Sequence, residues 1–250
     1  MTRRRFQRLL SLALLVAAMS ACGDNIENDP VLRLSAEEAL EAGLELMEQG
    51  KYYRAREHFD HAFAVAPNSA AGREALLHSA DSLFGQGGVQ NYVRAEAKYR
   101  DFQTRFPTSD QADYVQFRVA ESLFARAEHP DRDQTTTKKA YEAFESMIRV
   151  YPTSENVPVA QQRILDLRTI LAEHEFKVAF FYHRYGNSAG AVNRLDGLIE
   201  DFPDYGERDK AMYFLGRAHL KGGQPDLAEE AFGRLRVEYP GSKWINKIPR

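Results

Sequence analysis

Residues 211–240 read AMYFLGRAHLKGGQPDLAEEAFGRLRVEYP, and four of their positions recur along the chain. The segment ends at Pro240, which follows an apolar residue. Phe232 stands 8 positions before this proline, Ala228 stands 12 before it and Gly216 stands 24 before it. Because self-similarity at a fixed spacing is the signature of a repeat architecture, this pattern governs how the rest of the chain is interpreted.

The pattern occurs five times in register. Each segment ends in an apolar residue and a proline: Ala66-Pro67, Phe106-Pro107, Tyr151-Pro152, Phe202-Pro203 and Tyr239-Pro240. The alanines that stand 12 positions before these prolines are Ala55, Ala95, Ala140, Ala191 and Ala228. The large apolar residues that stand 8 positions before them are Phe59, Tyr99, Phe144, Leu195 and Phe232. The three segments without insertions also carry a small residue 24 positions before the proline: Gly43, Ala179 and Gly216. This spacing is typical of the tetratricopeptide repeat, an antiparallel helix pair.

Packing explains the residue types. The small residue on the first helix and the alanine on the second lie where two helices approach closely, and the bulky residue four positions later shares the alanine's face. The proline disfavours helix in the residue before it and so closes the second helix. Ser35 and Glu38 form a capping-box signature at the first helix. Gly223 suits a left-handed position after a helix and Pro225 suits the start of the next.

The repeats predict an all-α, right-handed superhelix of five helix pairs with a concave face. The longest interval, between Pro152 and Pro203, accommodates an extra helix before repeat four. The predicted tetratricopeptide-repeat domain is 35–250, with repeats at about 35–68, 69–108, 109–153, 173–204 and 205–240 and the extra helix at 154–172.

The amino terminus reads as a lipoprotein signal. Four arginines precede an apolar run from Leu9 to Ala18, and small residues then lead to Cys22, the only cysteine of the chain. The run is shorter than the roughly 20 residues that span a bilayer. We expect a signal peptide at 1–21, lipidation at Cys22 and a lipidated tether at 22–34, the alternative being an ordinary signal with an incidental cysteine. Gly23, where enterobacterial lipoproteins retained in the inner membrane tend to have Asp, favours the outer membrane, periplasmic face.

Composition and motifs argue against several function classes. Loss of the signal peptide would move the formal net charge from −3 to −7, which disfavours nucleic-acid binding. His58 and His61 lie three positions apart, but no cysteine or further ligand motif accompanies them. Gly85–Gly88 follows no strand and precedes no Lys-Ser/Thr, so a flexible turn is the expected structure. We therefore predict no catalytic residue, no metal site and no cofactor.

Two polar sites and one aromatic site are candidates for partner binding. Asp131, Arg132 and Asp133 belong to a cluster that also holds Gln134 and Thr135, and this cluster either starts a helix or forms a structured loop presented to a partner. Asn193 precedes Arg194, which either extends to solvent or holds a carboxylate of a neighbouring repeat through a bidentate pair. The third site is aromatic and predicted to be mostly core, with some rings reaching the concave surface: Phe176, Phe180, Phe181, Tyr182 and Tyr185.

Several strings resemble the BamD (ComL/YfiO) family of outer-membrane β-barrel assembly lipoproteins. The resemblance covers nearly all of the chain after Cys22 and is most specific between Asp131 and Pro203. The strings are Asp131-Arg132-Asp133-Gln134-Thr135, Ala143-Phe144 leading to Tyr151-Pro152-Thr153-Ser154, Leu171-Ala172-Glu173-His174-Glu175-Phe176 with Val178-Ala179, and Ala191-Val192-Asn193-Arg194.

The resemblance implies a non-enzymatic scaffold. Its amino-terminal repeats would receive unfolded outer-membrane proteins, and its carboxy-terminal repeats would dock a BamA-like β-barrel subunit beside other Bam lipoproteins. Two other readings stay open: a Tol–Pal-associated coordinator of envelope constriction and an adaptor for peptidoglycan enzymes. The absence of an amino-terminal heptad segment and the long insertion before repeat four both favour the BamD reading over the coordinator.

Overall fold

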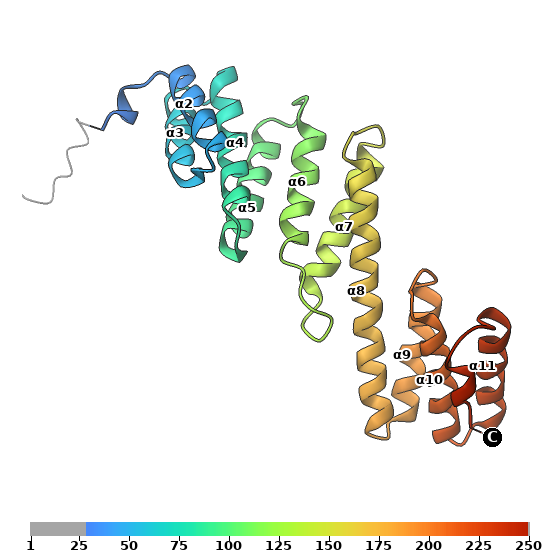
Figure 1. The fold of residues 1–250 in the computed structure, drawn as a ribbon. Helices are drawn as coiled ribbons and strands as arrows, with labels where there is room; N and C mark the ends of the chain where they lie inside the picture. Colours follow the sequence, from blue (N-terminus) through green and yellow to red (C-terminus); the bar gives the residue numbers. More distant parts are fainter. Residues whose placement is uncertain (1–28, 250) are drawn as a thin grey trace, which may run out of the picture. The chain divides into compact units, whose positions relative to one another are not determined.

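The computed structural model describes residues 29–249, so the predicted signal peptide and Cys22 lie outside the described residues. All regular structure in this range is helical, which confirms the predicted all-α class (Figure 1). The elements are η2 (Val31–Arg33), α2 (Ala36–Glu48), α3 (Tyr52–Val65), α4 (Ala70–Gln86), α5 (Val89–Arg105), α6 (Ala112–Phe124), α7 (Thr135–Val150), α8 (Val157–Arg184), α9 (Ser188–Asp201), α10 (Arg208–Lys221), α11 (Pro225–Glu238) and η3 (Ile245–Lys247).

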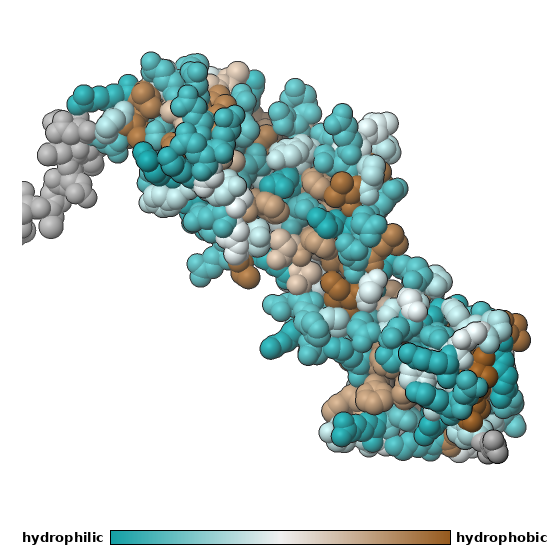
Figure 2. Space-filling view, in the orientation of Figure 1, coloured by the Kyte–Doolittle hydropathy of each residue, from teal (hydrophilic) through white to brown (hydrophobic). Residues whose placement is uncertain are grey.

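The chain forms two compact units, Met1–Gly85 and Gln86–Arg250. In the described part of the first unit, α2 and α3 pack against each other, and α4 adds Ala71 and Ala75 to their core. In the second unit each helix from α5 to α11 packs against the next along the chain. Buried side chains from α8 to α11 form one continuous core in this unit. On the face shown in Figure 2, hydrophilic side chains predominate over this unit, and apolar ones gather near the end of α8 and over α11.

The repeat positions lie where the helices meet. All five signature alanines are fully buried. A Cβ atom added to Gly43 would lie 2.4 Å from the Phe59 ring, and one added to Gly216 would lie 2.4 Å from the Phe232 ring. No ordinary Cβ contact is that short, so the small residue and the large ring are matched within one helix pair.

The predicted helix ends are also present. Ser35 and Glu38 form a complete capping box at α2, and Pro225 occupies the first position of α11. Gly223 has φ +73°, the left-handed conformation expected of it. Each of the five residues that precede a repeat proline has left the helical region of backbone angles. Their φ angles range from −124° at Phe202 to −141° at Ala66.

The structure corrects the predicted break between the extra helix at 154–172 and repeat four. Val157–Arg184 is a single helix of 28 residues, α8. No glycine or proline interrupts it around Ala172, and Pro158 lies in its first turn, where a missing N–H costs nothing. The inserted residues therefore lengthen the first helix of repeat four instead of forming a separate one.

Candidate partner-binding groove

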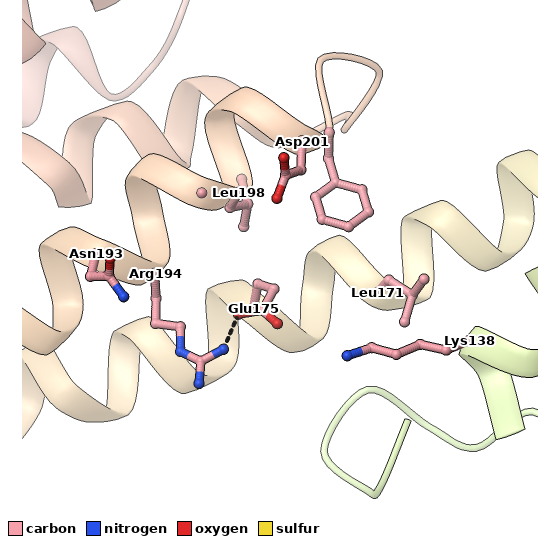
Figure 3. A pocket seen from close by; sticks show the side chains of 9 residues that line it. Lys138, Leu171, Glu175, Asn193, Arg194, Leu198 and Asp201 are labelled. Atoms are coloured by element: carbon pink, nitrogen blue, oxygen red, sulfur yellow. Dashed lines mark hydrogen bonds and ion pairs between the residues drawn. The ribbon is translucent and has the colours of Figure 1, made fainter. Parts of the chain in front are cut away.

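A polar groove opens between α7, α8 and α9, with a volume of about 450 Å³ (Figure 3). It lies within the second unit. Leu171 and Leu198, both buried, supply its apolar part. The residues that line it are Lys138, Leu171, Glu175, Asn193, Arg194, Gly197, Leu198, Asp201 and Phe202.

Arg194 lies on the rim of this groove and binds Glu175. Its Nη1 donates a hydrogen bond of 2.8 Å to the Glu175 Oε2, and this bond raises the pKa of the guanidinium. The Arg194 side chain is 43% exposed. The sequence left two possibilities, extension to solvent or a bidentate pair with a neighbouring repeat, and neither describes Arg194 fully. The arginine does bind a carboxylate, but through one nitrogen, and this carboxylate is on the paired helix of the same repeat. The prediction of a bidentate bridge to a neighbouring repeat is wrong, because Glu175 of α8 lies nearer.

Asn193 and Lys138 add polar groups to the groove. Asn193 is exposed one position before Arg194. Lys138 projects from the start of α7, and its ammonium points toward Glu175 (Figure 3). No carboxylate among residues 29–249 lies within ion-pair distance of Lys138. The groove thus holds two cations, Lys138 and Arg194, one amide, and two carboxylates, Glu175 and Asp201. Glu175 already binds Arg194, so an incoming acidic group would bind mainly through Lys138 and the Asn193 amide, and through Arg194 where it replaces Glu175.

The cluster around Asp131 is a structured loop that precedes α7. Gln134 is only 4% exposed, and its side-chain amide donates to the carbonyls of His129 and Arg132 at 2.9 and 3.0 Å. The ring of His174 on α8 lies 2.7 Å from the Pro130 carbonyl, so α8 holds the loop from outside. The loop keeps its shape through these contacts while Asp131, Arg132 and Asp133 remain exposed.

Both loop carboxylates favour the charged form. The Asp133 carboxylate accepts the backbone N–H of Thr135 at 2.9 Å, which lowers the pKa of Asp133. A hydrogen bond with the His129 ring lowers the pKa of Asp131. The helix-start reading and the structured-loop reading therefore both describe this segment, because the same residues start α7 and present charge to solvent.

The prediction that the aromatic stretch is mostly core is wrong, because only one of its five rings is buried. Phe176 is buried, whereas Phe180, Phe181 and Tyr185 are 41%, 56% and 71% exposed. Tyr185 lies at the carboxyl end of α8, with its ring centroid 4.5 Å from that of Phe181. It is ten residues along α8 from Glu175, about 15 Å of helix, so it does not belong to the Arg194 groove.

Sequence reasoning missed Lys138 and the supporting roles of Glu175, His174 and Gln134. Lys138, Glu175 and His174 act on segments that are distant in the sequence, whereas Gln134 binds two carbonyls of its own loop. None of the four belongs to the repeat signature. The pairing of Arg194 with Glu175, nineteen residues earlier, had no local signal. The family strings contain His174 and Glu175, but their presence alone does not reveal a partner.

We expect His174→Ala to loosen the loop without unfolding the unit. Losing one side-chain hydrogen bond costs about 1 kcal/mol. Amide hydrogen exchange should therefore quicken in residues 129–134 and stay unchanged in α10. His58→Ala is the matched control, because its ring contacts only the Arg54 carbonyl on its own helix. Equal protection of the loop in both variants would contradict the anchoring role of His174.

The described residues contain no constellation for metal binding. No group of three or more histidine, cysteine or acidic side chains converges among residues 29–249. His58 and His61 point to different partners, the carbonyls of Arg54 and Leu34. Within the same range, no helix has the length and hydropathy that crossing a membrane requires.

The family model and the curated relatives that match this chain name one family. The model of the YfiO family, described as an outer membrane lipoprotein, matches residues 33–235. A protein of Pasteurella multocida (strain Pm70) named outer membrane protein assembly factor BamD is 24% identical over 238 residues, covering 90% of this chain and 88% of that protein. The protein of the same name from Rickettsia prowazekii (strain Madrid E) is 24% identical over 243 residues, covering 97% and 95%. A solved thermophilic TPR protein of Thermus thermophilus is 18% identical and covers 85% of this chain and 95% of that one, with a TM-score of 0.37, too low to carry an argument.

Proposed function

The chain belongs to the YfiO family of outer membrane lipoproteins, and from this membership we propose that it is a non-enzymatic scaffold of the outer-membrane β-barrel protein assembly (Bam) complex. The family match over residues 33–235 is the observation that carries the proposal. Relatives named outer membrane protein assembly factor BamD support it, since they align with 90% or more of this chain. These names do not favour the alternative of an adaptor for envelope division or peptidoglycan enzymes.

Helix pairs suit this work physically. A stack of pairs buries a continuous core and leaves rigid grooves between helices, which can receive extended or helical segments of other proteins. We propose that the amino-terminal repeats receive unfolded outer-membrane proteins and that the carboxy-terminal repeats dock a BamA-like β-barrel subunit, with other Bam lipoproteins alongside. The protein would sit on the periplasmic face of the outer membrane through lipid on Cys22.

We propose that the candidate residues contact these partners. Arg194 and Asn193 would bind an acidic group in the groove, with Lys138 as a second cation. Asp131, Arg132 and Asp133 would pair with complementary charges from their loop. Tyr185 would offer an exposed aromatic ring beyond the groove, and a ring that a partner buries contributes more to binding than a charge at the rim does.

The proposal is tested by a mild-detergent pull-down of the lipidated chain from native envelopes, with the retained proteins identified by mass spectrometry. A large β-barrel protein with repeated periplasmic domains is the expected partner. Recovery of Tol–Pal components or cell-wall enzymes in its place would assign the chain to the adaptor class.

We expect Arg194→Leu to reduce recovery of that subunit severalfold, because the leucine cannot bind an acidic group. The effect on folding should be small: an exposed ion pair contributes about 0.5 kcal/mol, so a double-mutant cycle with Glu175→Gln should give a coupling energy of that size. Arg234→Leu is the matched control, since Arg234 is 45% exposed and pairs with Glu238 on its own helix. Equal partner recovery for the two arginine variants would remove Arg194 from the binding surface.

A further inference from the structure

The last described residues, 242–249, fold back beside α10 and α11 after α11 has ended (Figure 1). We call this segment the C-terminal strap. Its only regular element is η3, three residues long. Trp244, Ile245 and Ile248 are partly buried against the core of the second unit, so the strap covers a surface that would otherwise face solvent.

One stripe of α10 receives the strap. Asp209, Tyr213 and Arg217 are four residues apart in turn and therefore share a helix face. The Ser242 hydroxyl donates to the Asp209 carboxylate at 2.6 Å, and the Tyr213 hydroxyl donates to the Lys247 carbonyl at 3.2 Å. Arg217 donates to the Tyr213 hydroxyl oxygen at 2.8 Å. The Tyr213 hydroxyl binds a backbone carbonyl, a group that every peptide has. The same face would therefore hold another extended peptide in the same way.

Trp244 provides the aromatic anchor of the strap. Its ring centroid lies 5.0 Å from that of Tyr213 and 5.6 Å from that of Phe214. These separations are typical of favourable aromatic pairs. Lys247 and Lys243 of the strap lie over the indole at 4.2 and 5.7 Å and pair with no carboxylate among the described residues. The lysines thus contribute little to holding the strap on α10.

The aromatic surface under Trp244 continues beyond the strap. Phe214 contacts Phe180 with centroids 5.3 Å apart and Phe176 with centroids 5.6 Å apart. Phe180 remains 41% exposed, so the row of rings has an open end on α8. The strap therefore covers only part of a surface that is already built for aromatic side chains.

We propose that the C-terminal strap is an internal ligand, which occupies a peptide-binding face of α10 that also accepts an extended partner segment with an aromatic side chain in the place of Trp244. The contacts of the strap define what the partner must supply. It needs one aromatic side chain to pack against Tyr213 and Phe214, and a backbone carbonyl to accept a hydrogen bond from the Tyr213 hydroxyl. Because the strap is tethered to its own site, it competes at high effective concentration and lowers the apparent affinity for any partner. This inference does not depend on the proposed function, since its test needs only this chain and its own strap.

The first experiment uses the full chain and its own fluorescence. Trp244 is the only tryptophan, so its emission reports the strap alone. The probe is a synthetic peptide of residues 242–249 with phenylalanine in place of the tryptophan. Its addition should displace the strap, shift Trp244 emission to longer wavelength and increase quenching by acrylamide. The same peptide with alanine at that position is the control and should change nothing. Equal effects of both peptides, or no effect of either, would overturn the proposal.

The second experiment measures the competition. A fluorescein-labelled peptide of residues 242–249 should bind the full-length Trp244→Ala chain about tenfold or more tightly than the natural chain, because the weakened strap leaves the face open. Anisotropy gives both affinities, and circular dichroism checks that the variant keeps its helices. Equal affinity for the two chains would overturn the proposal. Loss of helix in Trp244→Ala would also overturn it, since the strap would then be part of the structural core.

Discussion

Cys22→Ala is expected to move the protein from the membrane fraction to the soluble fraction. The lipid proposed on this thiol would attach the protein to the membrane. Each methylene group buried in the bilayer contributes about 0.8 kcal/mol to binding, so several acyl chains hold the protein firmly where one holds it weakly. The described residues add no helix that could span the bilayer. Fractionation of envelopes before and after an alkaline carbonate wash measures the effect, because the wash removes protein held only by its partners.

Asn25→Ala is the matched control for this variant. It changes the predicted tether but leaves the cysteine, so it should stay in the washed membranes and incorporate labelled palmitate. Cys22→Ala should incorporate none, since the chain contains no other cysteine. Membrane retention of Cys22→Ala after the wash would refute the lipid anchor and leave the helix-pair fold untouched.

Gly216→Ala is expected to destabilise the second unit by about 1 kcal/mol. The new methyl group would lie 2.4 to 2.7 Å from three atoms of the Phe232 ring, and Phe232 is only 2% exposed, so the ring has no free space to enter. Overpacking of this kind costs about 1–3 kcal/mol, which outweighs the gain of up to about 1 kcal/mol from replacing a helical glycine with alanine. Urea denaturation followed by circular dichroism should show a lower midpoint.

Gly233→Ala on α11 separates packing from helix propensity. A Cβ at Gly233 would meet no atom within 4 Å, so this variant should gain up to about 1 kcal/mol from propensity alone. Phe232→Leu combined with Gly216→Ala should recover part of the lost stability by making room for the methyl group. If Gly216→Ala and Gly233→Ala shift the midpoint in the same direction, the close approach of α10 and α11 is not what selects glycine at Gly216.

The repeat signature predicted the helix pairs because it records local and pairwise constraints. A proline must end a helix near its own position, and a glycine that meets a phenylalanine sixteen residues later reflects a single helix hairpin. Both rules operate over one repeat, so Gly216, Phe232 and Pro240 could be interpreted without knowing the rest of the fold. The same holds for Ser35 and Glu38, whose capping box lies within one helical turn.

The insertion before repeat four shows where such rules stop. Its length indicated additional helix, and the residues are helical, but spacing alone did not show whether a turn separates them from the repeat. The stretch around Ala172 lacks a helix breaker, and buried Leu167, Leu171 and Phe176 give α8 a continuous apolar face. Continuity depends on what this face packs against, which the sequence of the insertion does not contain.

Residue types, spacing and end signals in the sequence determined the all-α class, the five helix pairs, the caps and the identity of the candidate residues. The tertiary structure decided which distant side chains contact each other. Arg194 binds Glu175 on its paired helix, and His174 contacts the carbonyl of Pro130, 44 residues away in the sequence. Trp244 packs against Tyr213 on α10. The physical reason is range: helix formation and hairpin packing act over a few turns of chain, whereas a groove, an anchored loop or a strap depends on where distant segments come to lie once the whole unit has packed.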